Sequence, residues 1–203
     1  MASKGLLVRM DAKEGKGGES EDFLRSALPV VRAEPATPAW FALRFGRGEY
    51  GIFDVFPDDT GRDAHLNGDV ARALKQKAAE LLDKGPEIGK LDVLAEKVPL
   101  ADSTQPVTKA ILLTFKAKAG HEPEVEQLLR DARALAMEEP ATFAWWAIRL
   151  ADGHYGIFDV FPDNGGRFAH LAGPVTRELA RHSLTLLGSV PDLALIDVLS
   201  AKL

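Results

Sequence analysis

The sequence contains no cysteine. This absence excludes disulfide bonds, thiolate metal sites, iron–sulfur clusters and a cysteine nucleophile. It fits a reducing compartment, and we expect a cytoplasmic protein. No apolar run approaches the roughly 20 residues that a helix needs to cross a bilayer, and the N-terminus lacks the apolar segment of a signal peptide. We therefore expect neither a membrane span nor export.

Excess positive charge is also lacking. The 203 residues include 25 Lys and Arg against 30 Asp and Glu, for a formal net charge of -5. Because no long basic run is present, we expect neither nucleic acid nor a membrane surface as a partner. The familiar metal, dinucleotide, P-loop and hydrolase motifs are missing as well. We expect no metal and no cofactor, and we expect His121, His154 and His182 at the surface.

What the sequence does contain is an internal repeat. The segment that starts at Ala36 recurs at Ala141, 105 positions later and without a gap, and the core GIFDVFPD is identical in both copies. Each copy spans about 93 residues. A solenoid has shorter repeats and more of them, so we do not expect one. The Pro-containing, polar stretch between the copies is typical of a linker. We predict domains over residues 1–98 and 110–203, a linker over 99–109, and a boundary near Ser103.

Each copy changes its hydrophobic period in the same order. Residues 5–12 and 110–117 are apolar runs of strand length, and residues 122–139 have helical spacing. Pro29 lies inside the equivalent helical segment of the first copy, which predicts a kink or an early end. Two strands, a helix and a last strand follow, so the order is β-α-β-β-α-β. This order predicts an α+β fold of two ferredoxin-like units, whose antiparallel sheets pack as an intramolecular pseudo-dimer.

The middle strands of each copy form a predicted hairpin. Arg47-Gly48 and Asp152-Gly153 are the two-residue turns. Carried back along the strands of the first copy, the turn predicts the pairs Gly46–Glu49, Arg44–Gly51, Ala42–Phe53 and Trp40–Val55. One sheet face would then carry Arg44 and Trp40, and the opposite face would carry Tyr50 and Asp54.

A carboxylate interrupts each apolar third strand. Asp54 and Asp159 are costly to bury without a partner. Arg62 and Arg167, just beyond the strands, are the predicted partners in a structural ion pair. The alternative interpretation is an acid or base with a shifted pKa in a pocket.

A histidine follows each of these arginines by three residues. His65 and His170 would share a helical face with Arg62 and Arg167. An imidazole near neutral pKa can remove a proton from a phenol or hold an oxyanion. A packed, hydrogen-bonded histidine is the alternative.

The segment YGIFDVFPDDTGRDAHL combines a tyrosine in the third strand, a Pro-Asp turn and Ala-His-Leu at the next helix. It resembles the antibiotic biosynthesis monooxygenase (ABM) domains of the dimeric α+β barrel superfamily, and the resemblance covers both copies. Enzymes of this family mostly oxygenate quinols or polycyclic phenols without metal or flavin. The resemblance implies a pocket between sheet and helices in each unit, with a small aromatic molecule as ligand.

The resemblance also implies roles for individual residues. The expected catalytic groups are a base, a cation and a hydroxyl donor. They are His65, Arg44 and Tyr50 in the first copy and His170, Arg149 and Tyr155 in the second. The aromatic residues suited to a flat ligand are Trp40, Trp145, Phe53 and Phe158. Asparagine occurs only at positions 67 and 164, outside the strands, which disfavours the haem-degrading branch.

Two hypotheses follow. The first is a cofactor-independent monooxygenase that oxidises a quinol-like or polycyclic phenolic aromatic with O2. The second is a non-catalytic small-molecule-binding or structural module of the same fold. The sequence leaves open whether pseudo-dimers associate further and whether one of the two pockets has lost its role.

Overall fold

A computed structural model describes residues 1–99 and 105–203, so the predicted boundary at Ser103 lies outside the described residues. The first copy forms β1 (Lys4–Asp11), α1 (Gly17–Ser26), α2 (Leu28–Arg32), β2 (Ala39–Gly46), β3 (Glu49–Phe56), α3 (Asp59–Leu66), α4 (Asp69–Leu81) and β4 (Glu87–Lys97). The second forms β5 (Lys109–Lys116), α5 (Glu122–Met137), β6 (Ala144–Ala151), β7 (His154–Phe161), α6 (Asn164–Leu171), α7 (Pro174–Leu186) and β8 (Asp192–Lys202). The strands make a closed barrel in the order β1-β3-β2-β8-β5-β7-β6-β4. The predicted pseudo-dimeric α+β barrel is confirmed.

The chain divides into two compact units, residues 1–91 with 196–203, and residues 92–195. These units do not coincide with the two sequence copies at the ends of β4 and β8. Residues 92–97 of β4 pair antiparallel with β6, and residues 197–202 of β8 pair antiparallel with β2. Each unit is therefore completed by the last strand segment of the other copy.

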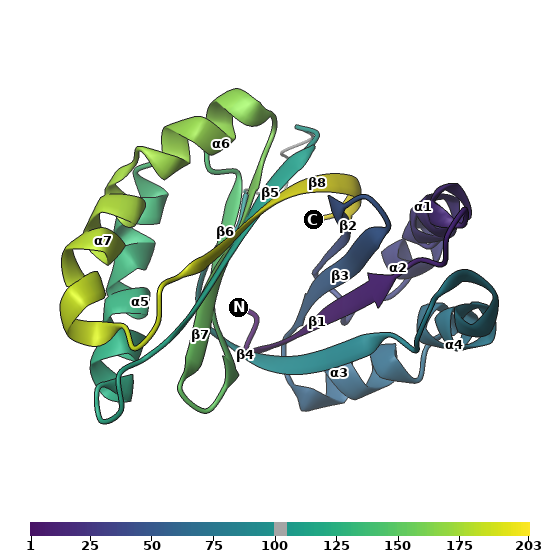
Figure 1. Cartoon of the computed structure of the whole chain (residues 1–203), viewed down its shortest axis with the longest axis horizontal. Helices are drawn as coiled ribbons and strands as arrows, with labels where there is room; N and C mark the ends of the chain where they lie inside the picture. Colours follow the sequence, from purple (N-terminus) through teal and green to yellow (C-terminus); the bar gives the residue numbers. More distant parts are fainter. Residues whose placement is uncertain (100–104) are drawn as a thin grey trace. The chain divides into compact units, whose positions relative to one another are not determined.

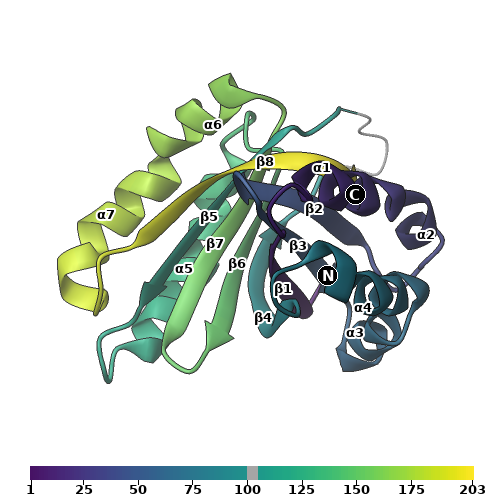
Figure 2. The same cartoon turned by 45° about the vertical axis from the view of Figure 1, so that its right-hand side comes forward.

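Within each unit the helices cover one face of the sheet (Figures 1 and 2). In the first unit, α1, α2 and α4 pack on β1, β3 and β2 through a buried cluster that includes Val8, Leu24, Ile52 and Leu74. The helix α3 contacts β1 and β3 outside this cluster. In the second unit, α5 and α7 pack on β5, β7 and β6 through the equivalent cluster, and α6 contacts β5 and β7 outside it. We call the covered side the helix-facing side of each sheet.

The β2–β3 hairpin corrects one prediction. Gly48 has a φ of +82°, as the predicted turn requires, and Gly46 pairs with Glu49. A β-bulge between Arg44 and Gly46 then shifts the register by one residue, so Arg44 pairs with Tyr50 and Trp40 pairs with Asp54. The predicted pairs Arg44–Gly51, Ala42–Phe53 and Trp40–Val55 are therefore wrong.

The bulge has a consequence for the site. It brings Arg44 and Trp40 to the same side of the sheet as Tyr50 and Asp54, because paired residues point to one face. The second hairpin has its bulge between Arg149 and Ala151 and shows the same shift.

The first helical segment differs between the copies. In the first copy it is broken into α1 and α2, with Pro29 at the start of α2, which confirms the predicted early end. In the second copy α5 runs unbroken over 16 residues. Among the described residues, no helix is long and apolar enough to cross a membrane.

Candidate functional site

A buried cluster of three charged side chains lies on the helix-facing side of the first unit. His65 of α3 has its Nδ1 2.6 Å from Oε2 of Glu34 and its Nε2 3.2 Å from Oδ2 of Asp54. Asp54 is fully buried, and His65 is 6% exposed. The side chain of Asp58 caps α3 by accepting the Gly61 N–H at 2.9 Å. This cap fixes the start of the helix that carries His65.

The second unit repeats the cluster. His170 Nδ1 lies 2.5 Å from Oε2 of Glu139, and its Nε2 lies 3.0 Å from Oδ2 of Asp159. Thr142 donates its hydroxyl hydrogen to the same Glu139 oxygen at 2.7 Å. We call the two clusters the Glu–His–Asp triads.

The triads strongly favour protonated histidines. Burial lowers the pKa of His65, but the adjacent Asp54 and Glu34 outweigh burial and raise that pKa to about 9. The same balance raises the pKa of His170 to about 10. Burial raises the pKa of the Asp54 carboxyl, and the imidazole opposes this shift. At neutral pH each imidazole is therefore an imidazolium ion held between two acidic side chains.

The triads correct the predicted ion pairs. Asp54 pairs with His65 rather than with Arg62, whose guanidinium contacts Asp59 and donates to the carbonyl of Leu91 at 3.2 Å. Arg62 lies in the first turn of α3, and the carboxylate of Asp59, three residues earlier on the same helix, is within its reach.

In the second unit Asp159 likewise pairs with His170, and Arg167 donates to Asn164 at 2.7 Å. Sequence reasoning missed Glu34 and Glu139. The segment Glu-Pro-Ala-Thr, identical in both copies, was the signal that could have identified them.

A second polar cluster surrounds the predicted arginine and tyrosine. The Arg44 guanidinium bridges Glu21 at 2.9 Å and Asp197 at 2.8 Å. The Tyr50 hydroxyl lies 3.3 Å from Glu21 Oε1 and 3.1 Å from the carbonyl oxygen of Gly17. Burial, and then the charge of Glu21, raises the pKa of Tyr50. Tyr50 is therefore a hydrogen-bond donor at neutral pH.

The second unit has the same arrangement. Arg149 bridges Glu126 at 2.9 Å and Asp92 at 2.7 Å, and Tyr155 lies 3.3 Å from Glu126 Oε1. The structure thus brings each predicted Arg and Tyr together. It places the predicted His apart from them, because Tyr50 and Asp54 lie four residues apart along β3.

The predicted aromatic set is also divided. Trp40 and Trp145 belong to the helix-facing clusters of their units. Phe53 and Phe158 point to the opposite face, where Phe53 packs against Phe41 and Phe158 against Trp146, with ring centroids 6.4 and 6.1 Å apart. The shifted register explains the separation, because Phe53 pairs with Phe41 and not with Ala42. The four residues do not line one pocket.

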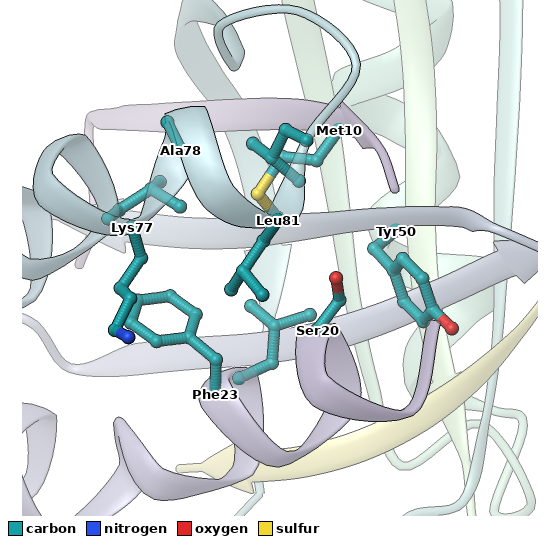
Figure 3. Close-up of a pocket in the computed structure, with 10 residues that line it drawn as sticks. Met10, Ser20, Phe23, Tyr50, Lys77, Ala78 and Leu81 are labelled. Atoms are coloured by element: carbon teal, nitrogen blue, oxygen red, sulfur yellow. The ribbon is translucent and has the colours of Figure 1, made fainter. Parts of the chain in front are cut away.

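The first unit contains a pocket between α1, α4 and the sheet (Figure 3). Its walls are mostly apolar, and its polar lining side chains are Ser20, Tyr50 and Lys77. The cavity measures about 10 Å³, close to the minimum for one water molecule. Tyr50 links this pocket to the Arg44 and Glu21 cluster, whereas His65 is not among the lining residues.

The second unit has a larger groove of about 630 Å³ between α5 and α7. Leu128, Leu135 and Leu186 line it together with acidic side chains such as Glu124 and Glu178. All of its lining residues belong to the two helices, so the groove does not extend to the sheet. Within the described part of the chain, no group of three or more His, Asp or Glu side chains has the geometry of a metal site.

Solved structures share this architecture over the full chain. A protein described as a monooxygenase from Fusobacterium nucleatum has a TM-score of 0.85 at 13% identity, with 99% of this chain and 94% of that chain covered. A ferredoxin-fold protein from Listeria monocytogenes, described as related to antibiotic biosynthesis monooxygenases, has a TM-score of 0.54 at 8% identity and covers 98% and 95%. This chain has the ferredoxin-like fold of these proteins over nearly its full length. The resemblance predicted from the sequence is confirmed.

Two further solved structures resemble this chain. An anthrone oxidase-like protein has a TM-score of 0.65 at 9% identity, with 100% of this chain and 93% of that chain covered. A protein of unknown function from Nitrosomonas europaea is 50% identical over 50% of this chain and 98% of its own, with a TM-score of 0.49. No protein-family model and no curated protein sequence matches the chain.

Proposed function

We propose that the protein is a cofactor-independent monooxygenase that oxidises a quinol-like or polycyclic phenol with O2. The observation that carries this proposal is the apolar pocket of the first unit, which adjoins the Tyr50, Glu21 and Arg44 cluster. Proteins of the same fold described as a monooxygenase and as anthrone oxidase-like support this reaction class. Because a fold does not determine a reaction, the substrate class depends on the pocket.

In the proposed reaction the substrate itself supplies the electrons. The phenol loses its hydroxyl proton, and the phenolate transfers an electron to O2. The resulting superoxide and phenoxyl radical combine at a ring carbon that is ortho or para to the oxygen and carries a hydrogen, and the peroxide takes up the proton that the hydroxyl lost. Loss of water then leaves a quinone, so one oxygen atom of O2 enters the product, the other leaves as water, and O2 is the only oxidant.

The cluster offers two of the groups that this reaction needs. The Tyr50 hydroxyl can donate a hydrogen bond to the developing phenolate, and the low polarity of the pocket strengthens such a bond. The Glu21 carboxylate, in contact with Tyr50 and held by Arg44, is the proposed proton acceptor, reached through the tyrosine. His65 is an imidazolium ion outside the pocket, so we assign it a positioning role in place of the predicted role as base.

Oxygen consumption tests the proposal. Hydroquinones and naphthols would be offered in the presence of a metal chelator, with a blank lacking protein. We expect uptake above the blank with the wild type, and a fall of at least tenfold in Tyr50→Phe, which loses a hydrogen-bond donor to the oxyanion. The double variant His65→Ala/His170→Ala would lose stability along with activity. Uptake equal to the blank across the panel would refute the enzyme proposal.

A non-catalytic binding module is the second candidate. The hydrogen bonds of Tyr50 favour this candidate. Its hydroxyl is already engaged by Gly17 and Glu21, so it would have to leave these partners before it could donate to a phenolate. Saturable binding of a phenol without oxygen consumption would support this alternative.

A further inference from the structure

The two units differ at the place where the first unit has its pocket. Ser20 of α1 lines that pocket and is 4% exposed. Its hydroxyl oxygen has no hydrogen-bond partner among the described residues. Figure 3 shows this hydroxyl directed into the space between α1, α4 and Tyr50. A buried hydroxyl without a partner costs free energy, so this position favours a ligand atom that can pair with it.

The rest of the lining suits the apolar part of such a ligand. Met10 of β1, Phe23 of α1 and Leu81 of α4 line the pocket (Figure 3). Leu24 of α1 and Leu74 of α4 line it as well. The other polar lining groups are already engaged, Tyr50 with Glu21 and Lys77 with Glu80 at 2.8 Å. A water molecule needs two to four polar partners, so water alone fits this space poorly.

The second unit has apolar side chains at the corresponding positions. Val125 stands where the first unit has Ser20, and Phe115 stands where it has Met10. Phe115 is buried and packs on the Tyr155 ring, with the ring centroids 6.4 Å apart. The orphan hydroxyl is thus absent from this position, and an aromatic ring takes up space beside the tyrosine.

The helix over the pocket is also built differently in the two units. Gly17 and Gly18 begin α1, and this helix ends before Pro29. The second copy has Glu122 and Pro123 at the start of a helix that continues for 16 residues. Because glycine weakens a helix and proline favours its first turn, α1 is the less stable helix and the easier one to displace.

We propose that the protein binds one small hydroxylated aromatic molecule per chain, in the first unit only, with the Ser20 hydroxyl as its polar anchor. The ligand enters as α1 moves away from α4, because the cavity of about 10 Å³ must widen to admit a ring. The ligand class rests on the proposed function. The restriction to one unit and the role of Ser20 rest on the structure of the pocket.

Calorimetric titration with 1-naphthol and with naphthalene, which lacks the hydroxyl, tests the proposal on the full chain. We expect one site per chain and a preference for 1-naphthol. Ser20→Ala should weaken 1-naphthol binding about tenfold and leave naphthalene binding unchanged, since it removes one hydrogen bond and little volume. Met10→Phe, which copies the second unit, should abolish binding of both probes. Val125→Ala is the matched control and should change neither.

Several results would overturn the proposal. They are two sites per chain, no binding of either probe to the wild type, equal effects of Ser20→Ala and Val125→Ala, or binding that survives Met10→Phe. Circular dichroism would show that the variants are folded. Failure here differs from failure of the proposed function, because binding with the expected variant pattern can occur without oxygen consumption. Conversely, turnover that is insensitive to Ser20→Ala would leave the enzyme proposal standing and remove the anchor.

Discussion

Raising the pH from 7 to 9 is expected to destabilise the folded chain through the two Glu–His–Asp triads. The pKa of His65 is about 9 and that of His170 about 10 in the folded state, against 6.5 for an ordinary histidine. A pKa that is raised on folding contributes stability that is complete below pH 6.5 and is lost as the pH passes the folded value. Because each unit of pKa corresponds to about 1.4 kcal/mol, His65 contributes about 3 kcal/mol at pH 6.

The magnitude sets the size of the measured effect. Between pH 7 and 9 the folded state holds up to two protons that the unfolded state has released, so the free energy of unfolding falls by up to about 3 kcal/mol per pH unit. Globular domains are stable by about 5–15 kcal/mol, so this change is easily measured. The window stops at pH 9 because burial lowers the pKa values of Lys97 and Lys202, which act in the opposite direction at higher pH.

Urea unfolding followed by circular dichroism at pH 7, 8 and 9 measures the slope. His65→Gln should remove about half of this slope. His154→Gln, at the start of β7 and outside the triads, is the matched control and should leave the slope unchanged. A free energy of unfolding that stays constant within about 1 kcal/mol from pH 7 to 9 would refute the reasoning. A folded state that keeps protons which the unfolded state has released must lose stability as the pH rises.

Three further changes probe parts of the same framework. Glu34→Gln removes one of the two carboxylates beside His65 and should lower its pKa by about 1 unit or more, measured by NMR titration of the imidazole protons; an unchanged pKa would contradict the triad. Gly51→Ala should lower the free energy of unfolding by about 1–3 kcal/mol in urea, because a Cβ there would lie 2.4 Å from the Val8 carbonyl oxygen. Gly46→Ala is the control and should have little effect, because the nearest atom to its Cβ lies 3.8 Å away. Asp58→Ala removes the cap of α3 and should cost about 1 kcal/mol in thermal unfolding, and Asp58→Asn should restore most of it.

The sequence was sufficient to predict the fold because the repeat presents each pattern twice. The order of helices and strands along the chain, the hairpin turns and the break at Pro29 are all signalled by local chemistry, whereas the pairing of β4 and β8 with strands of the other copy is not. The bulge at Phe45 was not predictable in this way. Both registers place apolar residues on both sheet faces, so hydrophobic alternation does not distinguish them, and only the packing of Phe45 against Gly51 and Arg9 shows which one forms.

The candidate site was predictable in its residue types and not in its pairings. Arg44, Tyr50, Asp54 and His65 are all on the helix-facing side of the first unit, as chemistry-bearing residues of one site would be. Their partners Glu21 and Glu34 come from the helix α1 and from the loop after α2, and long-range partners of this kind leave no mark on local periodicity. The predicted Asp54–Arg62 pair failed for the same reason, because spacing along the chain favoured the nearer cation.

Comparison of the two units then separates structure from ligand binding. Both units keep the triad in full, and the pocket lined by Ser20 and Met10 lies in the first unit. The triad keeps its geometry in the second unit, where Phe115 replaces Met10 beside the tyrosine. We therefore infer that the triad serves the fold, which both units need. Ser20 and Met10, in contrast, are replaced by Val125 and Phe115 in the second unit, and the glycines that begin α1 are replaced by Glu122 and Pro123. These differences lie on the helix and the strand that line the pocket of the first unit, as the proposed binding of a ligand in that unit requires.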